Sequence, residues 1–88
     1  MKISKLNLNE NEQKVLIGII ENAMDVTGGR FSITDELYLY LPEFTKNQIK
    51  GYLSQLEQKN IIKCHSDLNQ ICVSHDLDIE EFWQFEIK

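Results

Sequence analysis

Residues 31–74 carry two signals for the start of a helix, followed by two β-rich runs that enclose a turn-forming tetrapeptide. These signals predict a short helix over 35–41, a longer helix over 46–59 and a hairpin over 61–74. A helix, a turn, a helix and a hairpin in this order can share one apolar core in only a few ways. This order therefore constrains the fold more than any other feature, and it predicts a mainly α fold with a small antiparallel β-sheet (α+β).

The helix predicted over 46–59 has the clearest local signals. Thr45 and Gln48 stand at the spacing of a capping box, and Asn60 suits the left-handed residue that commonly ends a helix. Three apolar residues recur at helical spacing and predict one buried stripe. They are Ile49, Leu53 and Leu56.

Two further helices are predicted from similar signals. Thr34 is expected to be the N-cap of the helix over 35–41, which Pro42 then ends because proline cannot donate a backbone hydrogen bond. Upstream, Asn9 with an acid at the third position predicts a helix over 9–24. The sequence therefore places one long helix before the helix, helix and hairpin series.

The remaining segments connect or extend these elements. Gly28 and Gly29 predict a turn, because glycine adopts positive φ at little cost. Phe31-Ser32-Ile33 is expected to be a brief third strand of the sheet. A last helix is predicted over about 79–86, although residues 82–87 are also strand-like.

The chain resembles the winged-helix superfamily, most closely the pattern of MarR-type and related bacterial or phage regulators. The matching residues are Leu8…Gln13-Lys14-Val15-Leu16, Ile33-Thr34-Asp35-Glu36-Leu37, and Gln48-Ile49…Leu53-Ser54-Gln55-Leu56-Glu57-Gln58-Lys59-Asn60-Ile61-Ile62. This is a packing and capping pattern, so the resemblance is at the level of the superfamily. It implies a winged helix-turn-helix in which the third helix enters a DNA major groove and the hairpin is the wing. The predicted wing tip departs from the usual pattern, because it offers Asp67 and no cation.

The chain is acidic overall, but its charges are distributed unevenly along the sequence. The net charge of −5 over 88 residues argues against a generic nucleic-acid binder, whose affinity comes mainly from cations that meet phosphates. Residues 45–65 nevertheless hold four lysines against one glutamate, whereas residues 76–88 hold five acids against one lysine. The predicted binding element is therefore locally basic.

The outward side of the helix over 46–59 is the predicted DNA-binding surface, together with Lys63 of the following strand. Lysine suits phosphate or guanine, and the amides of Asn47 and Gln58 suit adenine. The alternative is a plain solvated or protein-binding face, because every soluble helix has a polar side. The predicted helix residues are Lys46, Asn47, Lys50, Gly51, Ser54 and Gln58.

The cysteines and histidines near the hairpin are the only cluster of metal-ligand types in the sequence. With a loop at 66–69, Ile62 pairs with Val73 and Cys64 with Ile71, so Cys72 faces away from Cys64. A register shifted by one residue would oppose the two cysteines but would split the apolar set between the two faces. We therefore expect reduced, structural cysteines, with no metal and no cofactor.

Other function classes lack their signals. No phosphate-binding loop, nucleophile elbow, zinc-protease motif or paired-carboxylate site is present, so the sequence predicts no enzyme. No apolar run approaches the ~20 residues of a membrane span, and a signal-peptide core is missing, so we expect a cytoplasmic protein without a membrane partner. Duplex DNA, a protein partner, or a second copy joined through the aromatic tail remain the expected partners. The tail aromatics are Phe82, Trp83 and Phe85.

Cutting the chain after Ser74 is expected to unfold or aggregate the protein. Burying one large apolar side chain is worth about 1.5–3 kcal/mol, a large share of the stability of a small domain. The competing interpretation makes the acidic tail a detachable cover over Lys46 and Lys50. Thermal melting of a 1–74 fragment separates the two, because a detachable tail leaves a cooperative fragment that binds DNA more tightly. A fragment with the melting temperature of the full chain would contradict the prediction.

Overall fold

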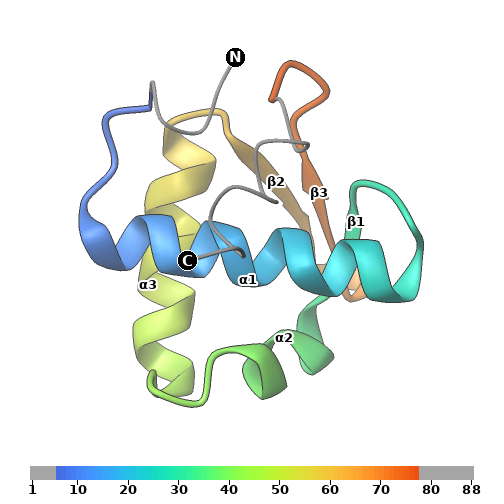
Figure 1. The fold of residues 1–88 in the computed structure, drawn as a ribbon, viewed down its shortest axis with the longest axis horizontal. Coiled ribbons are helices and arrows are strands. Elements are labelled where there is room, and N and C mark those ends of the chain that lie inside the picture. The colour runs from blue at the N-terminus through green and yellow to red at the C-terminus, as the bar shows by residue number, and fades with distance from the viewer. Residues whose placement is uncertain (1–5, 78–88) are drawn as a thin grey trace.

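The computed structural model describes residues 6–77, which form three α-helices and a three-stranded antiparallel sheet (Figure 1). This confirms the predicted α+β class. The helix predicted over 79–86 lies outside the described residues. The elements are α1 (Glu10–Val26), β1 (Phe31–Ile33), α2 (Thr34–Tyr40), α3 (Lys46–Gln58), β2 (Ile62–His65), a 3-10 turn (Ser66–Leu68) and β3 (Gln70–Val73).

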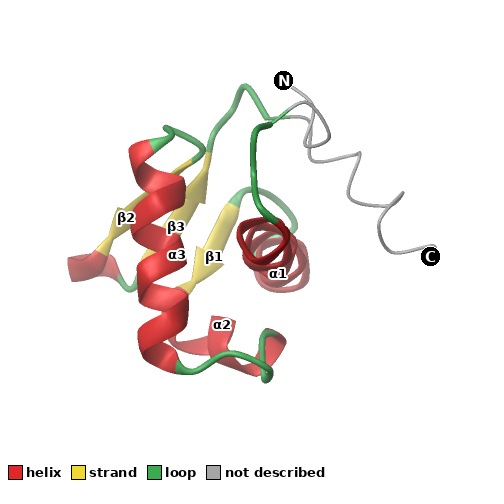
Figure 2. Cartoon of the chain, turned by 90° about the vertical axis from the view of Figure 1, so that its left-hand side faces the viewer, coloured by secondary structure: helices red, strands yellow, loops and turns green. Residues whose placement is uncertain are grey.

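The sheet has the order β1-β3-β2, so the predicted third strand lies beside the second arm of the hairpin. Ile62 pairs with Val73 and Cys64 with Ile71, as predicted from the apolar alternation. The helices α1 and α3 lie on the same side of this sheet (Figure 2). One face of the sheet is therefore buried against helices, and its residues join the core.

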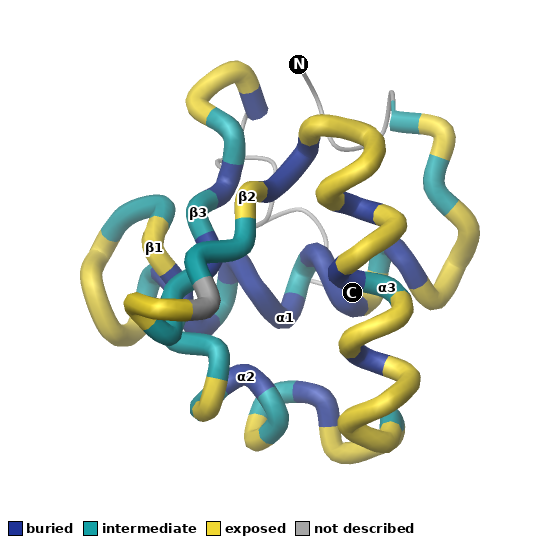
Figure 3. The backbone as a smooth tube through the Cα atoms, turned by 180° about the vertical axis from the view of Figure 1, so that it is seen from behind, coloured by how far each residue is buried: buried dark blue, intermediate teal, exposed yellow. Residues whose placement is uncertain are grey.

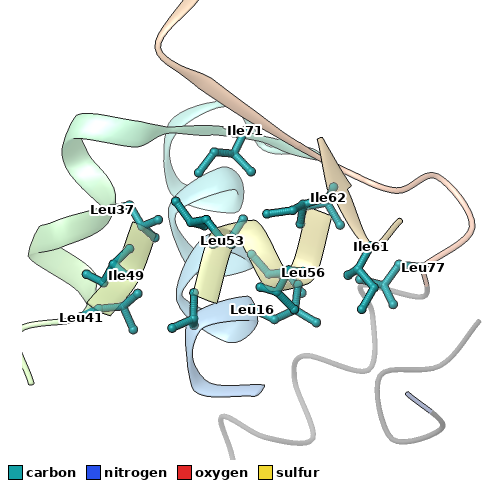
Figure 4. Packing of buried hydrophobic residues seen from close by; sticks show 14 residues of the cluster. Leu16, Leu37, Leu41, Ile49, Leu53, Leu56, Ile61, Ile62, Ile71 and Leu77 are labelled. Atoms are coloured by element: carbon teal, nitrogen blue, oxygen red, sulfur yellow. The ribbon is translucent and has the colours of Figure 1, made fainter. Parts of the chain in front are cut away.

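The core is built around α1, whose apolar stripe is almost completely buried. The exposed fractions of Val15, Leu16, Ile19, Ile20 and Ala23 are at most 1%. The predicted stripe of α3 packs onto this surface (Figure 4). Leu77, the last described residue, is 1% exposed and joins the same cluster. A cut after Ser74 thus removes a core residue, and a cut after Leu77 tests the rest of the tail alone.

The helix caps are largely those predicted from local sequence. Asn9 with Glu12 and Thr45 with Gln48 both form complete capping boxes. Asn60 has a φ of 61° at the end of α3, and Gly28 has a φ of 69° after α1. These predictions succeed because capping depends on residues within one helical turn.

The predicted N-cap at Thr34 is wrong. Ile33 occupies the cap position without a side-chain hydrogen bond, and Thr34 is already the first helical residue. The Thr34 N–H instead donates to the Asn69 carbonyl at 3.0 Å. A backbone partner from the hairpin therefore satisfies this donor, and α2 follows β1 directly.

Three helix ends also differ slightly from prediction. The second helix ends at Tyr40, one residue early, and Leu41 takes the C-cap position. The first helix continues past residue 24 to Val26, because the Thr27 N–H and hydroxyl both donate to the Ala23 carbonyl and prolong the turn. The third helix ends at Gln58, one residue early, and Lys59 takes the C-cap position. Differences of this size are ordinary at frayed helix ends.

An ion pair joins the start of α1 to the end of α3, with a buried carboxylate and an ammonium on a partly exposed side chain. The Glu12 side chain is 3% exposed and accepts the Asn9 N–H at 3.0 Å. The Lys59 ammonium donates to both Glu12 oxygens at 3.1 and 3.0 Å and to the Asn7 carbonyl at 3.1 Å. The Asn9 bond lowers the pKa of Glu12 below its ordinary value of 4.5; Lys59 reinforces this effect and burial opposes it.

Lys59→Met is expected to destabilise the fold by about 1–3 kcal/mol, because it leaves a buried carboxylate without its cation. Since the pKa of Glu12 is lowered on folding, its contribution is complete above pH 4.5 and is lost as the pH falls further. Urea unfolding at neutral and acidic pH should therefore show a shallower acid dependence for the variant than for the parent.

Lys14→Met is the matched control, because Lys14 pairs with Glu10 at 3.6 Å on an exposed surface. Such pairs are worth about 0–1 kcal/mol. Equal losses in the two variants would contradict the structural role of Lys59.

Candidate nucleic-acid interface

All seven residues of the predicted binding surface are exposed. In Figure 3 the α3 tube is exposed over most of its length and is interrupted by its buried stripe. The seven residues are Lys46, Asn47, Lys50, Gly51, Ser54, Gln58 and Lys63. Their side chains are thus available to a partner, although they do not form one uniform patch.

Four of these residues follow one line along α3, which we call the outward line. Asn47, Gly51, Ser54 and Gln58 fall within about 60° of one another at ~100° per residue. Lys50 lies about 40° to one side of Ser54 on the same wheel. Within residues 6–77, no hydrogen bond or ion pair engages these polar side chains. The outward line is therefore polar, unpaired and centred on small residues.

The lysines around this line are not equivalent. Lys46 turns toward α2, with its ammonium 5.2 Å from the centre of the Tyr38 ring. Lys63 stands on β2 beyond the C-terminal end of α3, on the sheet face opposite to Ile62. Lys59, which adds to the local charge in the sequence, is committed to Glu12. Three lysines of this region form no ion pair within residues 6–77: Lys46, Lys50 and Lys63.

Glu57 lies about two turns after Lys50 on α3 and is engaged with the backbone. Its Oε2 accepts the Cys64 N–H at 3.0 Å, a donor on the free edge of β2. Glu57 and Lys63 both line an open groove of about 530 Å³ at this end of α3, together with Asn60. The carboxylate covers a strand edge that would otherwise offer an unpaired donor.

Gln55 belongs to the same surface but is absent from the predicted set. It is exposed and lies about 40° from Gly51 around the helix. A helical wheel centred opposite the buried stripe identifies it, because that centre falls between Gly51 and Gln58. The outward side of α3 is therefore richer in amides than predicted.

The tip of the hairpin, predicted to be the wing tip, is acidic and apolar. Asp67 is exposed, and Leu68 is 61% exposed. Asn69 adopts a φ of 53°, and its Nδ2 donates to Asp35 Oδ2 at 3.1 Å, which ties the tip to α2. The turn at residues 66–69 is confirmed, and it carries no cation toward a phosphate.

The two cysteines are free and lie on opposite faces of the sheet. Cys64 shares the inward face with Ile62, whereas Cys72 pairs with Lys63 on the outward face. Burial, assisted by the Glu57 carboxylate, raises the pKa of the Cys64 thiol, which keeps it protonated and weakly nucleophilic. No metal-binding group of three side chains occurs within residues 6–77.

Comparison with protein-family models, with curated proteins and with solved structures gave no match. Within the described range, none of the helices combines the length and the apolar character that a membrane span requires. The geometry and chemistry of the surface are therefore what indicate the function of this chain.

Two glycines, each inside a helix, provide a direct test of the open surface. A Cβ at Gly18 would lie 2.8 Å from Leu41 Cδ2, whereas a Cβ at Gly51 would meet nothing within 4 Å. Gly51→Ala should stabilise the fold by about 0.5–1 kcal/mol through helix propensity. Gly18→Ala should destabilise it by about 1–3 kcal/mol through overpacking. Urea unfolding of both variants measures the contrast, and a destabilised Gly51→Ala protein would mean that the site is covered.

Proposed function

We propose that this chain is a DNA-binding transcriptional regulator of winged-helix type, with α3 as the helix that enters the major groove. The order α1, β1, α2, α3 and a two-stranded wing supports this proposal, as does a sheet in which β1 pairs with the second wing strand. Residues 41–45 join α2 to α3 in a short connection of the helix-turn-helix kind.

Gly51 is the single observation that carries the proposal. Glycine inside an exposed helix costs about 1 kcal/mol relative to alanine. At Gly18 the approach of Leu41 explains the glycine, but no described residue approaches Gly51. The glycine lowers the stability of the helix but keeps its surface flat, which suits the close approach of an outside partner. Polar and basic side chains surround Gly51. We accordingly expect Gly51→Ala to weaken binding while it stabilises the fold.

The proposal is tested by binding to mixed-sequence duplex DNA across a salt series. Each neutralised phosphate contributes about −0.9 to the slope of log affinity against log salt concentration. Lys46, Lys50 and Lys63 together would give about −2.7 per protomer. We therefore expect weak binding with this modest slope, and undetectable binding at low salt would contradict the proposal.

Lys50→Glu should abolish this binding without unfolding the protein, because an exposed substitution usually shifts stability within about 0.5 kcal/mol. Lys14→Glu is the matched control, since it makes the same charge change on α1, outside the outward line. If Lys50→Glu and Lys14→Glu both bind duplex DNA as well as the parent does, α3 is not the DNA-binding element.

The second candidate is a winged-helix module that binds a protein partner through the same surface. The acidic wing tip and the commitment of Lys59 to Glu12 favour it, because both reduce the charge available to phosphates. If the parent chain is well folded but shows no detectable binding to duplex DNA at low salt, this alternative is favoured.

A further inference from the structure

The outward side of α3 is equipped for one kind of base contact more than for others. The commonest specific contact in the major groove is an arginine that binds guanine in bidentate fashion. The chain has one arginine, Arg30, and its Nη1 donates to the Ser74 carbonyl at 2.6 Å. The outward line instead carries the amides of Asn47 and Gln58. Amides pair with adenine, whose N6 donates and whose N7 accepts.

Asn47 is the better placed of the two amides. It lies in the first turn of α3, and the N-terminal residues of a recognition helix are those that contact base edges. The neighbouring Gln48 is occupied, because its Oε1 accepts the Thr45 N–H at 2.8 Å. Asn47 has no hydrogen-bond partner within residues 6–77, so both halves of its amide are available.

The short side chain of Asn47 requires the helix to come close to the bases. Gly51 is one turn further along the outward line, and a Cβ there would meet only open space. Ser54 follows with another small side chain. These two residues remove the bulk that would hold the helix axis away from the groove floor.

We propose that Asn47 reads an adenine in the major groove through a bidentate contact to N6 and N7, while Lys50 holds a phosphate beside it. This inference rests on the proposed function, because it assumes that α3 enters the groove. It goes further by assigning a base preference and a residue for it. Asn47 then sets specificity, and Lys50 sets affinity without regard to sequence.

The test begins with selection from a randomised duplex library by the full chain at low salt. The selected sites should share an adenine, and replacing it by 7-deazaadenine, which lacks N7, should weaken parent binding. Asn47→Ala should lose about 5- to 150-fold in affinity for the natural site, the range that one bidentate contact is worth. It should also bind the natural and the 7-deaza sites equally.

Lys50→Ala provides the contrast within the same helix. It should weaken binding to all sequences alike and reduce the magnitude of the salt slope by about one. Asn47→Asp is a second variant that the helix N-terminus tolerates well, and it should lose adenine preference because it cannot donate to N7. Circular dichroism confirms that each variant retains its helices.

The possible failures are distinguishable. Selected sites without a common adenine, or an Asn47→Ala protein that still discriminates the 7-deaza site, would overturn the role of Asn47 and leave DNA binding intact. A library that yields no bound duplex at low salt would overturn the proposed function and this inference with it.

Discussion

Burial of the apolar side of α1 is the constraint on which the rest of the structure depends. This helix contacts β1, α2 and α3, and its core residues are almost fully excluded from water. Gly18 lets Leu41 approach so closely that any larger residue would displace it. Asn22, which is fully buried on α1, accepts the Ser32 hydroxyl at 2.6 Å and the Ile33 N–H at 2.7 Å. One helix therefore positions both the sheet and the helix pair.

This arrangement buries one side of α3 in the core and leaves the other side exposed to solvent. Ile49, Leu53 and Leu56 hold it against α1, and the bond between Lys59 and Glu12 fixes its C-terminal end. This ion pair engages Lys59, so its positive charge is less available to phosphates at the candidate interface. With so few free lysines, electrostatic attraction to phosphates can supply only weak affinity, and contacts to base edges have to add to it.

The hairpin is tied to its neighbours by hydrogen bonds, but its tip is poorly suited to phosphates. The Asn69 carbonyl and amide both bond to the start of α2, and the Arg30 side chain bonds to the backbone after β3. These contacts stabilise the position of the hairpin relative to β1 and α2. Its exposed tip of Asp67 and Leu68 favours contact with protein over contact with DNA. The α3 surface and the hairpin tip thus have different chemical preferences.

Local sequence by itself determined the capping boxes at Asn9 and Thr45, the left-handed turns at Gly28 and Asn60, and the strand register. Each of these depends on residues within one turn or on the alternation of a strand. The tertiary structure decided the backbone partner of Thr34 and the commitments of Lys59 and Glu57. In two of these cases the partners lie tens of residues apart in the chain, as with Lys59 and Glu12. Even Glu57 bonds across an element boundary to β2. Which lysines remain free for a partner therefore follows only from the packing of α3 against α1 and the sheet, because spacing along the chain does not encode such contacts.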